Sequence, residues 1–420
     1  MKRRSWKSES NFPPIFPVSK RLAALFCVSS LLAFSATSCG LVEMRDATSE
    51  VLTRAETTAP TLQQAERYSV VESVGETETM PETEAAVEEE PAMHVALAVA
   101  GGVRIDDAIL SDAASRAAEG KDYSFLTMYA NIFPVIQNAD MTMVTLQDPV
   151  GDGTGAMPMD SLTALTDLGF DVINVAGTDR LENAGAGLRT TVDNVCTHDV
   201  LEIGAYKDDI DAGDVRVLEQ DGVRVAYVAF TENADTDTDG LILHDLTDAA
   251  NVSAIVTYAD LVSDVVVVSV TWDNGTDSTV RAEQRSACQL LAEAGADIIV
   301  GNDGRGLQTA EWLTAEDGTQ TLAVYSLGYL LSTGSDAQTT LSGVLTLDVV
   351  MNEAGETTLE DVQILPVVKH YTAEGGYQVT ELTKYTADMA ALHGLGNITV
   401  DALQSVVNGT LPAAFLPTNN

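Results

Sequence analysis

Acidic and amide side chains follow the apolar runs of this sequence, at the points where strands should end. The set comprises Asp106, Gln147, Asp179, Asp273, Asn302 and Asp303. Loops at the carboxyl ends of parallel strands gather at one edge of a sheet, so these oxygens are expected to converge on one pocket. All-oxygen ligands suit Ca²⁺, Mg²⁺ or Mn²⁺. The alternative is an acid-rich chain without a cation site, in which Arg305 neutralises part of the charge.

Histidine is missing from all of these loops. The histidines stand elsewhere in the chain: His94, His198, His244, His370 and His393. A two-metal hydrolase holds its ions about 4 Å apart with a bridging carboxylate and several imidazoles. Without imidazole ligands we expect no such pair, and we interpret each histidine as a surface or structural residue.

A second acidic stretch has the spacing of half a calcium loop. In ADTDTDGLILHD, three alternate acids and a glycine match the first half of an EF-hand: Asp235, Asp237, Asp239 and Gly240. The twelfth position is Leu246, so the bidentate acid is absent. The stretch is therefore either a solvated acidic loop or a weak calcium site. The sequence has no Gly-rich phosphate loop, no G-x-S-x-G elbow and no Cys–His pairing that would supply another active centre.

Strands and helices that would position these loops alternate from residue 94 onward. β-branched runs such as DMTMVTL, GFDVINVAG, VRVAYVAF, DVVVVSVTW and GADIIVG are separated by helical stretches such as DSLTALTDLG and STVRAEQRSACQLLAEAG. A β-hairpin, LTLDVVMNEAGETTLEDVQILPV, follows near the end. The pattern predicts an α/β sheet protein with its ligand site beyond the strand ends.

These segments, in this order, resemble the CapA capsule-synthesis family. The stretches that carry the resemblance are ALTDLGFDVINVA, RVLEQDGVRVAYVAFT, LLAEAGADIIVG, LQTAEWL and VYSLGYLLS. The resemblance implies a metallophosphatase-like fold over residues 93–370: a four-layer α-β-β-α sandwich of two sheets between helices. It also implies an association with poly-γ-glutamate or capsule production, and a metal pair in the strand-end loops.

The chain departs from the family at nearly every metal-binding position. The positions that correspond to the family site are Gly102, Asp106, Gln147, Asp179, Thr271, Asn302, Asp303 and Arg305. Glycine, glutamine and threonine stand there in place of family carboxylates and imidazoles. We therefore expect a catalytically inactive protein without a cofactor, with a binding or accessory role. The alternative is a metal-dependent hydrolase in which the remaining carboxylates hold Ca, Mg or Mn.

The first 92 residues indicate export. A basic stretch precedes the uncharged run LAALFCVSSLLAFSA, and ATSC resembles a bacterial lipobox. We expect a lipoprotein signal peptide over residues 1–38 with lipid on Cys39; ordinary cleavage and an uncleaved anchor are the alternatives. Residues 39–92 are rich in Glu, Thr, Ala and Pro and predict an acidic disordered tether. The protein is then lipid-anchored on the extracytoplasmic side of the membrane. Residues 371–420 form a C-terminal extension that packs on the domain or trails it.

The charge and the cysteines limit the partners. The formal charge is −41, with 63 acidic and 22 basic residues among 420. Such a surface repels nucleic acid and other polyanions, so the expected partners are the membrane through the lipid, capsule-assembly proteins or an envelope polymer. Cys196 and Cys288 either form a disulfide or are two small buried side chains.

Overall fold

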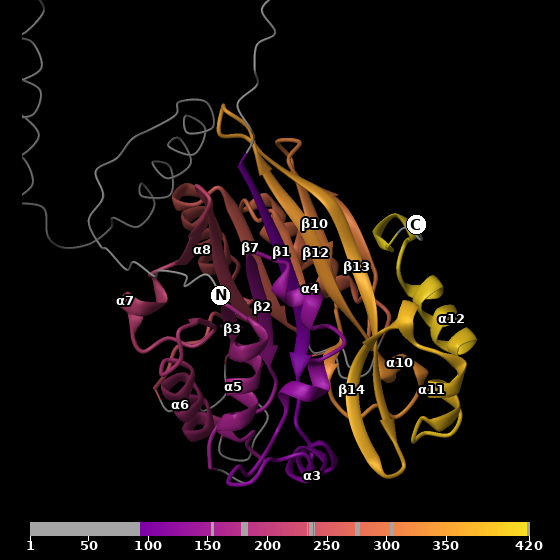
Figure 1. Cartoon of the computed structure of the whole chain (residues 1–420). Helices are drawn as coiled ribbons and strands as arrows, with labels where there is room; N and C mark the ends of the chain where they lie inside the picture. The colour runs from indigo at the N-terminus through magenta and orange to yellow at the C-terminus, as the bar shows by residue number, and fades with distance from the viewer. Residues whose placement is uncertain are drawn as a thin grey trace, which may run out of the picture. The chain divides into compact units, whose positions relative to one another are not determined.

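The computed structural model describes residues 93–417, except residues 153–154, 178–183, 233, 235–237, 239, 274–277 and 303–305. The predicted signal peptide, Cys39 and the predicted tether lie outside the described residues. The described residues form two β-sheets with helices on their outer faces (Figure 1).

The first sheet has eight strands in the order β14-β13-β12-β1-β2-β3-β4, with β11 paired to β1. Strands β1 to β4 and β11 are parallel, and β12 to β14 continue the sheet in antiparallel pairs. Their bounds are β1 (Met93–Val103), β2 (Met141–Leu146), β3 (Val172–Asn174), β4 (Leu201–Ile203), β11 (Tyr329–Leu331), β12 (Leu341–Met351), β13 (Thr357–Thr372) and β14 (Gly375–Glu381).

The second sheet has six strands in the order β5-β6-β7-β8-β10-β9. Its four central strands are parallel, and β5 and β9 pair with them in the antiparallel sense. The bounds are β5 (Arg216–Gln220), β6 (Val223–Thr231), β7 (Val265–Thr271), β8 (Ile298–Asn302), β9 (Ala310–Thr314) and β10 (Gln320–Val324).

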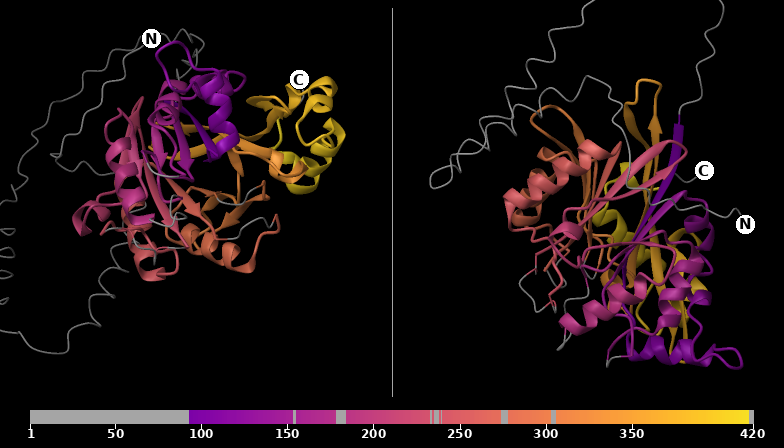
Figure 2. Two further views of the ribbon diagram at one scale, coloured as in Figure 1. Left: turned by 90° about the horizontal axis from the view of Figure 1, so that it is seen from below. Right: turned by 90° about the vertical axis from the view of Figure 1, so that its left-hand side faces the viewer.

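Helices cover the outer face of each sheet (Figure 2). The first sheet carries α3 (Asp107–Ser115), η1 (Leu126–Tyr129), α4 (Phe133–Gln137), α5 (Met159–Leu168) and α6 (Ala184–Val195), whose apolar residues share one cluster with its strands. The second sheet carries α8 (Ala249–Val262) and α9 (Ala282–Glu293) in another cluster. A third cluster lies between the sheets. The predicted four-layer α-β-β-α sandwich is therefore confirmed.

The apolar runs are continuous because both faces of the sheets are buried. In β7, Val265 and Val267 belong to the core between the sheets, whereas Val266 and Val268 pack under the helices. The period of two therefore places every second residue of a strand between the sheets. This alternation decides which strand-end side chains face the candidate site.

The C-terminal residues continue the domain. Strand β13 runs through Thr372, and β14 adds a further strand to the first sheet. The segment then forms η2 (Leu382–Lys384), α11 (Ala387–Leu392), α12 (Val400–Thr410) and η3 (Ala413–Phe415), next to α10 (Ala337–Thr340). Leu403, Val407 and Phe415 belong to the same apolar cluster as the core between the sheets.

Cys196 and Cys288 are both free; Cys196 is exposed and Cys288 is buried. The expectation of two buried thiols is therefore right for Cys288 only. Among the described residues, no helix combines the length and the apolar character needed to cross a membrane.

Candidate functional site

Polar side chains fill the space between the sheets at the carboxyl ends of the parallel strands. In β2 the inward positions Met141 and Met143 belong to the apolar core. The same alternation next places the polar residues Thr145 and Gln147 on the inward face. The inward-facing polar residues are Thr145, Gln147 and Asn174 from the first sheet and Ser269, Thr271 and Asn302 from the second, and all six are buried. The apolar core therefore ends in a polar layer at the edge where a ligand is expected.

Hydrogen bonds between four strands form the floor of this layer. The Asn174 Nδ2 donates to Ser269 Oγ at 2.8 Å and lies 3.4 Å from Thr145 Oγ1. Asn302 Nδ2 donates to the same Ser269 hydroxyl at 2.9 Å. The Asn174 Oδ1 accepts the Ala176 N–H at 2.8 Å. Asn174 and Ser269 thus join the two sheets by a direct side-chain bond.

Gln147 lies above this floor and fills the space beside two glycines. A Cβ atom on Gly102 would lie 2.7 Å from Gln147 Cγ and 2.9 Å from Tyr329 Cδ1. A Cβ atom on Gly177 would lie 3.0 Å from Gln147 Nε2. The glutamine therefore occupies the space that a larger residue at position 102 would need.

Three residues of this polar layer have buried polar atoms without partners among the described residues. These atoms are both side-chain atoms of the Gln147 amide, the Thr271 hydroxyl oxygen and the Asn302 Oδ1. The three side chains are at most 3% exposed. A buried polar atom left unpaired costs about 1–3 kcal/mol. We call Gln147, Thr271 and Asn302 the strand-end cluster.

The residues described at these positions do not fit a pair of transition-metal ions. Such a pair needs a bridging carboxylate and several nitrogen ligands, whereas the strand-end cluster offers two amides and one hydroxyl. Among the described residues, no group of three or more His, Cys, Asp and Glu side chains could hold a metal ion. The side chain of Gln147 also fills the space beside Gly102 from which a carboxylate would have to reach.

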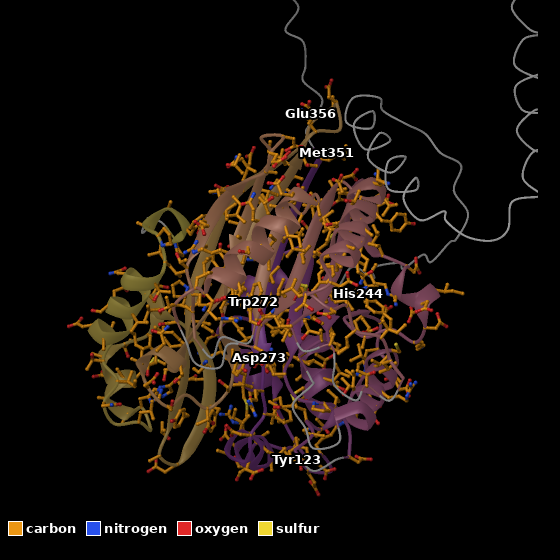
Figure 3. All side chains as sticks on the ribbon, turned by 180° about the vertical axis from the view of Figure 1, so that it is seen from behind. Tyr123, His244, Trp272, Asp273, Met351 and Glu356 are labelled. Carbon is orange, nitrogen blue, oxygen red and sulfur yellow. The ribbon has the colours of Figure 1, made fainter. Side chains whose placement is uncertain are left out.

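The two acids predicted here that the structure describes have other contacts. Asp106 is the N-cap of α3, and its Oδ1 accepts the N–H groups of Ala108 and Ile109 at 3.1 Å. Asp273 is exposed, and its backbone N–H donates to Glu232 Oε2 at 2.7 Å. Figure 3 shows Asp273 beyond the end of β7, next to the buried Trp272. In this structure the carboxylate of Asp106 therefore serves as the N-cap of α3.

The other predicted site residues lie outside the described residues: Asp179, Asp303 and Arg305 of the family site, and Asp235, Asp237 and Asp239 of the possible calcium loop. The twelfth position of that loop is described. Leu246 is 6% exposed and packs in the cluster under α8.

None of the histidines contributes to the strand-end cluster. His94 lies 3.1 Å from Asp348 on the sheet surface, and His198 is hydrogen-bonded at the end of α6. His244 packs against Tyr206, with ring centroids 4.5 Å apart, and burial lowers its pKa to about 4. The other two, His370 and His393, are buried in the packing of the C-terminal segment.

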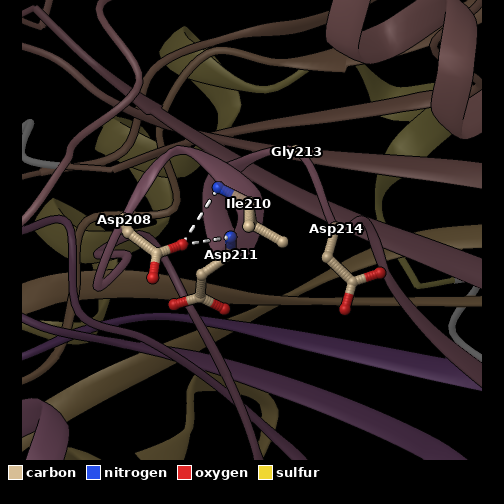
Figure 4. A pocket seen from close by; sticks show the side chains of 5 residues that line it. All are labelled: Asp208, Ile210, Asp211, Gly213 and Asp214. Carbon is tan, nitrogen blue, oxygen red and sulfur yellow. Dashed lines mark hydrogen bonds between the residues drawn. The ribbon is translucent and has the colours of Figure 1, made fainter.

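A shallow pocket beside α7 (Asp209–Ala212) is lined by Asp208, Ile210, Asp211, Gly213 and Asp214 (Figure 4). Its carboxylates already have partners in the protein. The Asp208 side chain accepts the N–H groups of Ile210 and Asp211 at 3.0 Å, and Asp211 pairs with Arg216 at 2.5 Å. This acidic surface is therefore explained by local structure.

Two site residues were missed by the sequence analysis. Asn174 and Ser269 stand inside the runs DVIN and VVVVSV, whose patterns indicate only buried strands. A polar residue at an inward position near the carboxyl end of a buried strand was the available signal. Their bond to each other depends on the packing of two sheets, which the sequence does not display.

Two face-to-face sheets, helices on both outer faces and a polar layer at the ends of the parallel strands define a metallophosphatase-like sandwich. A model of the family described as "Bacterial capsule synthesis protein PGA_cap" matches residues 96–333. The chain belongs to this family, which confirms the resemblance to CapA proteins.

Two relatives are similar over about half of the chain. The "PGA biosynthesis protein CapA" of Bacillus subtilis (strain 168) is 24% identical over 212 residues, 49% of this chain and 54% of that protein. The "Capsule biosynthesis protein CapA" of Bacillus anthracis is 23% identical over 235 residues, 50% and 53% of the respective chains. The chain thus spans about half the length of the curated relatives it matches.

Solved structures are similar at a lower level. The NAD nucleotidase NadN of Haemophilus influenzae has a TM-score of 0.42 and 10% identity, covering 79% of this chain and 58% of that one. A 5'-nucleotidase from Candida albicans has a TM-score of 0.34 and 10% identity, covering 62% and 53%.

Proposed function

We propose that this protein is a cell-surface CapA-like protein without hydrolytic activity. It acts as a binding or accessory component in the production of capsule, poly-γ-glutamate or another envelope polymer. The family membership and the two CapA relatives support the link to such polymers. The observation that carries the loss of catalysis is the side chain of Gln147, which fills the space beside Gly102.

The chemistry of the strand-end cluster supports this proposal. A two-metal hydrolase makes a hydroxide on one ion and clamps the reacting oxygens with both ions. Amides and hydroxyls carry no charge and bind transition metals weakly compared with carboxylates and imidazoles. Gln147, Thr271 and Asn302 can instead donate and accept hydrogen bonds, which is what binding without catalysis needs.

Anchoring is part of the proposed function. The lipobox-like ATSC predicts that Cys39 carries a lipid, and the acidic residues 39–92 would hold the domain away from the membrane. A domain with this negative charge is repelled from anionic lipid headgroups, so the lipid would supply the membrane attachment.

Metal analysis and turnover of the purified mature chain test the loss of catalysis. After dialysis we expect less than about one tenth of an equivalent of Zn, Mn or Fe, by analogy with sites that lack their ligand set. We expect no hydrolysis of a phosphodiester or of γ-linked glutamyl amides, with or without added Mn²⁺. Two retained transition-metal ions, or turnover that depends on Mn²⁺, would show that the proposal is wrong.

The accessory role needs a test in the producing cell. Deletion of the gene is expected to lower the amount of surface polymer, and the wild-type chain should restore it. A chain with Gln147→Met and Thr271→Val should fail to restore it while reaching the same surface level. Full restoration by that double variant would show that polymer production does not need the strand-end cluster.

A further inference from the structure

We propose that the strand-end cluster binds an uncharged group that carries both hydrogen-bond donors and acceptors, such as an amide or a sugar hydroxyl of an envelope polymer. This inference rests on the proposed function, because it assigns a ligand class to the same non-catalytic site. Its members are Gln147, Thr271 and Asn302, which are buried at inward-facing positions of the two sheets.

The geometry places the three side chains at one level. Gln147 is two residues beyond Thr145, and Thr271 is two residues beyond Ser269, so each lies one strand repeat above the floor. Thr271 and Asn302 are register partners in β7 and β8. The side chains therefore face the same space between the sheets.

The unpaired atoms determine the class of ligand. The Gln147 amide presents one donor and one acceptor whichever way it is turned, the Asn302 Oδ1 is an acceptor, and the Thr271 hydroxyl is both. A cation would leave the amide donor unpaired. An anion would leave the amide oxygens unpaired. Only a group that both donates and accepts can satisfy all four atoms.

The charge of the protein also favours an uncharged ligand. The cluster itself is uncharged, and the whole chain carries −41. A field of that sign disfavours carboxylates and phosphates near the surface. An uncharged group avoids this repulsion and also avoids the large penalty of placing an unpaired charge in a buried site.

Stability of the ligand-free protein is the first test. Replacing an unpaired buried polar atom by an apolar group of the same shape removes its desolvation penalty. Thr271→Val and Gln147→Met are therefore each expected to raise Tm by about 1–3 °C without ligand. The matched control is Thr142→Val in β2, because the Thr142 hydroxyl bonds Gly169 O at 2.6 Å and accepts the Asp171 N–H at 2.9 Å.

Thr142→Val should lower Tm, because it removes a hydroxyl that is hydrogen-bonded in the protein. The Thr271 hydroxyl has no such partner among the described residues, so Thr271→Val should have the opposite effect. If Thr271→Val and Gln147→Met also lower Tm, their polar atoms are satisfied by permanently bound water and serve the structure. That result would overturn the ligand proposal.

Calorimetric titration with tri-N-acetylchitotriose is the second test, since this uncharged sugar supplies both amides and hydroxyls. The mature wild-type chain in EDTA should bind it, and Gln147→Met or Thr271→Val should weaken binding at least tenfold. Thr142→Val, if folded, should bind as wild type. No binding at millimolar sugar, or equal binding of hexa-γ-glutamate, would overturn the ligand class. Those outcomes leave the metal and turnover results unchanged, so failure of the ligand class and failure of the proposed function are distinguishable.

Discussion

The side chain of Gln147 lies where a side chain on Gly102 would have to stand. A Cβ atom on Gly102 would be 2.7 Å from Gln147 Cγ and 2.8 Å from its Nε2. The two positions are therefore coupled: the glycine gives the glutamine its space, and the glutamine excludes a carboxylate. Regaining a metal site at this edge would require both residues to change together.

Gly102→Asp is the direct test of that coupling. The added atoms overpack the site, so we expect a loss of about 1–3 kcal/mol in the free energy of unfolding. Adding Gln147→Ala should recover part of this loss, because it removes the contact with Gln147 but leaves the one with Tyr329 Cδ1 at 2.9 Å. Urea unfolding of both single variants and the double variant gives the coupling energy.

Additive effects of Gly102→Asp and Gln147→Ala would contradict the packing argument. We also expect Gly102→Asp alone to bind no Mn²⁺ after dialysis, because one carboxylate cannot hold a metal pair. At least Asp179→His, Thr271→His and Asn302→His would be needed beside it.

The layers of the fold could be predicted because each apolar run keeps the period of its element. The β-branched runs VVVVSVT and IIV are buried on both faces, and the intervening helices have one apolar stripe. The sequence also contained the signal for the helix-capping role of Asp106. This acid directly precedes the helical stretch DAILSDAAS, which is the N-cap position.

The residues that form the candidate site could be predicted only in part. The resemblance located Gln147, Thr271 and Asn302, because they replace residues of a known motif. The bond between Asn174 and Ser269 joins residues 95 positions apart on different sheets, and no local pattern encodes it. The sequence also does not show which buried polar atoms lack a hydrogen-bond partner, because this depends on every neighbour of the side chain.

Lys369 gives a prediction on alkaline stability. This side chain is 1% exposed, its Nζ lies 3.5 Å from Leu341 O, and burial lowers its pKa to about 7, against a smaller opposing effect of Asp336. The unfolded chain keeps the ordinary lysine pKa, so between pH 7 and about 10 it binds a proton that the folded protein lacks. The contribution of Lys369 to the free energy of unfolding therefore rises with pH between pH 7 and about 10.

Lys369→Met should remove this rise and should stabilise the protein at pH 7 by on the order of 2 kcal/mol, because it replaces a buried amine by an apolar chain. Thermal unfolding at pH 7, 8.5 and 10 measures both effects. The control is Lys121→Met, at an exposed position, which should leave the pH profile unchanged. An unchanged profile in Lys369→Met would contradict the assignment.

The packing of the C-terminal segment should weaken in acid. Burial, and then the neighbouring His393, lower the pKa of His370 to about 4, and burial also lowers the pKa of His393. The polar and aromatic groups that contact the two rings are the Tyr385 hydroxyl, at 2.8 Å from His370 Nδ1; Tyr371; the Lys369 carbonyl, 3.2 Å from His393 Nε2; and the Leu395 N–H, which donates to His393 Nδ1 at 3.2 Å. Among the described residues, neither ring has a carboxylate hydrogen bond.

Both rings are therefore neutral in the folded protein at pH 7. The unfolded chain binds protons near pH 6.5, so stability from this pair is lost as the pH falls from about 6.5 toward 4. Hydrogen exchange of α11 and α12 should be faster at pH 4.5 than at pH 7 after correction for the intrinsic rate. His370→Phe should reduce this difference, and His94→Gln on the surface should not. Equal protection at the two pH values in the wild type would contradict the prediction.

Cys39→Ser tests the predicted anchor in the whole chain. If Cys39 is the lipidated residue, the wild-type protein should fractionate with membranes and resist high salt, because acyl chains hold it there by apolar burial. The Ser variant has no thiol to acylate, so it should appear in the soluble fraction or remain at the size of the uncleaved precursor. Cys196→Ser is the matched control, since it removes an exposed thiol of the domain and should leave the distribution unchanged. Wild-type protein in the soluble fraction, or Cys39→Ser protein that stays on membranes at the mature size, would show that the lipoprotein prediction is wrong.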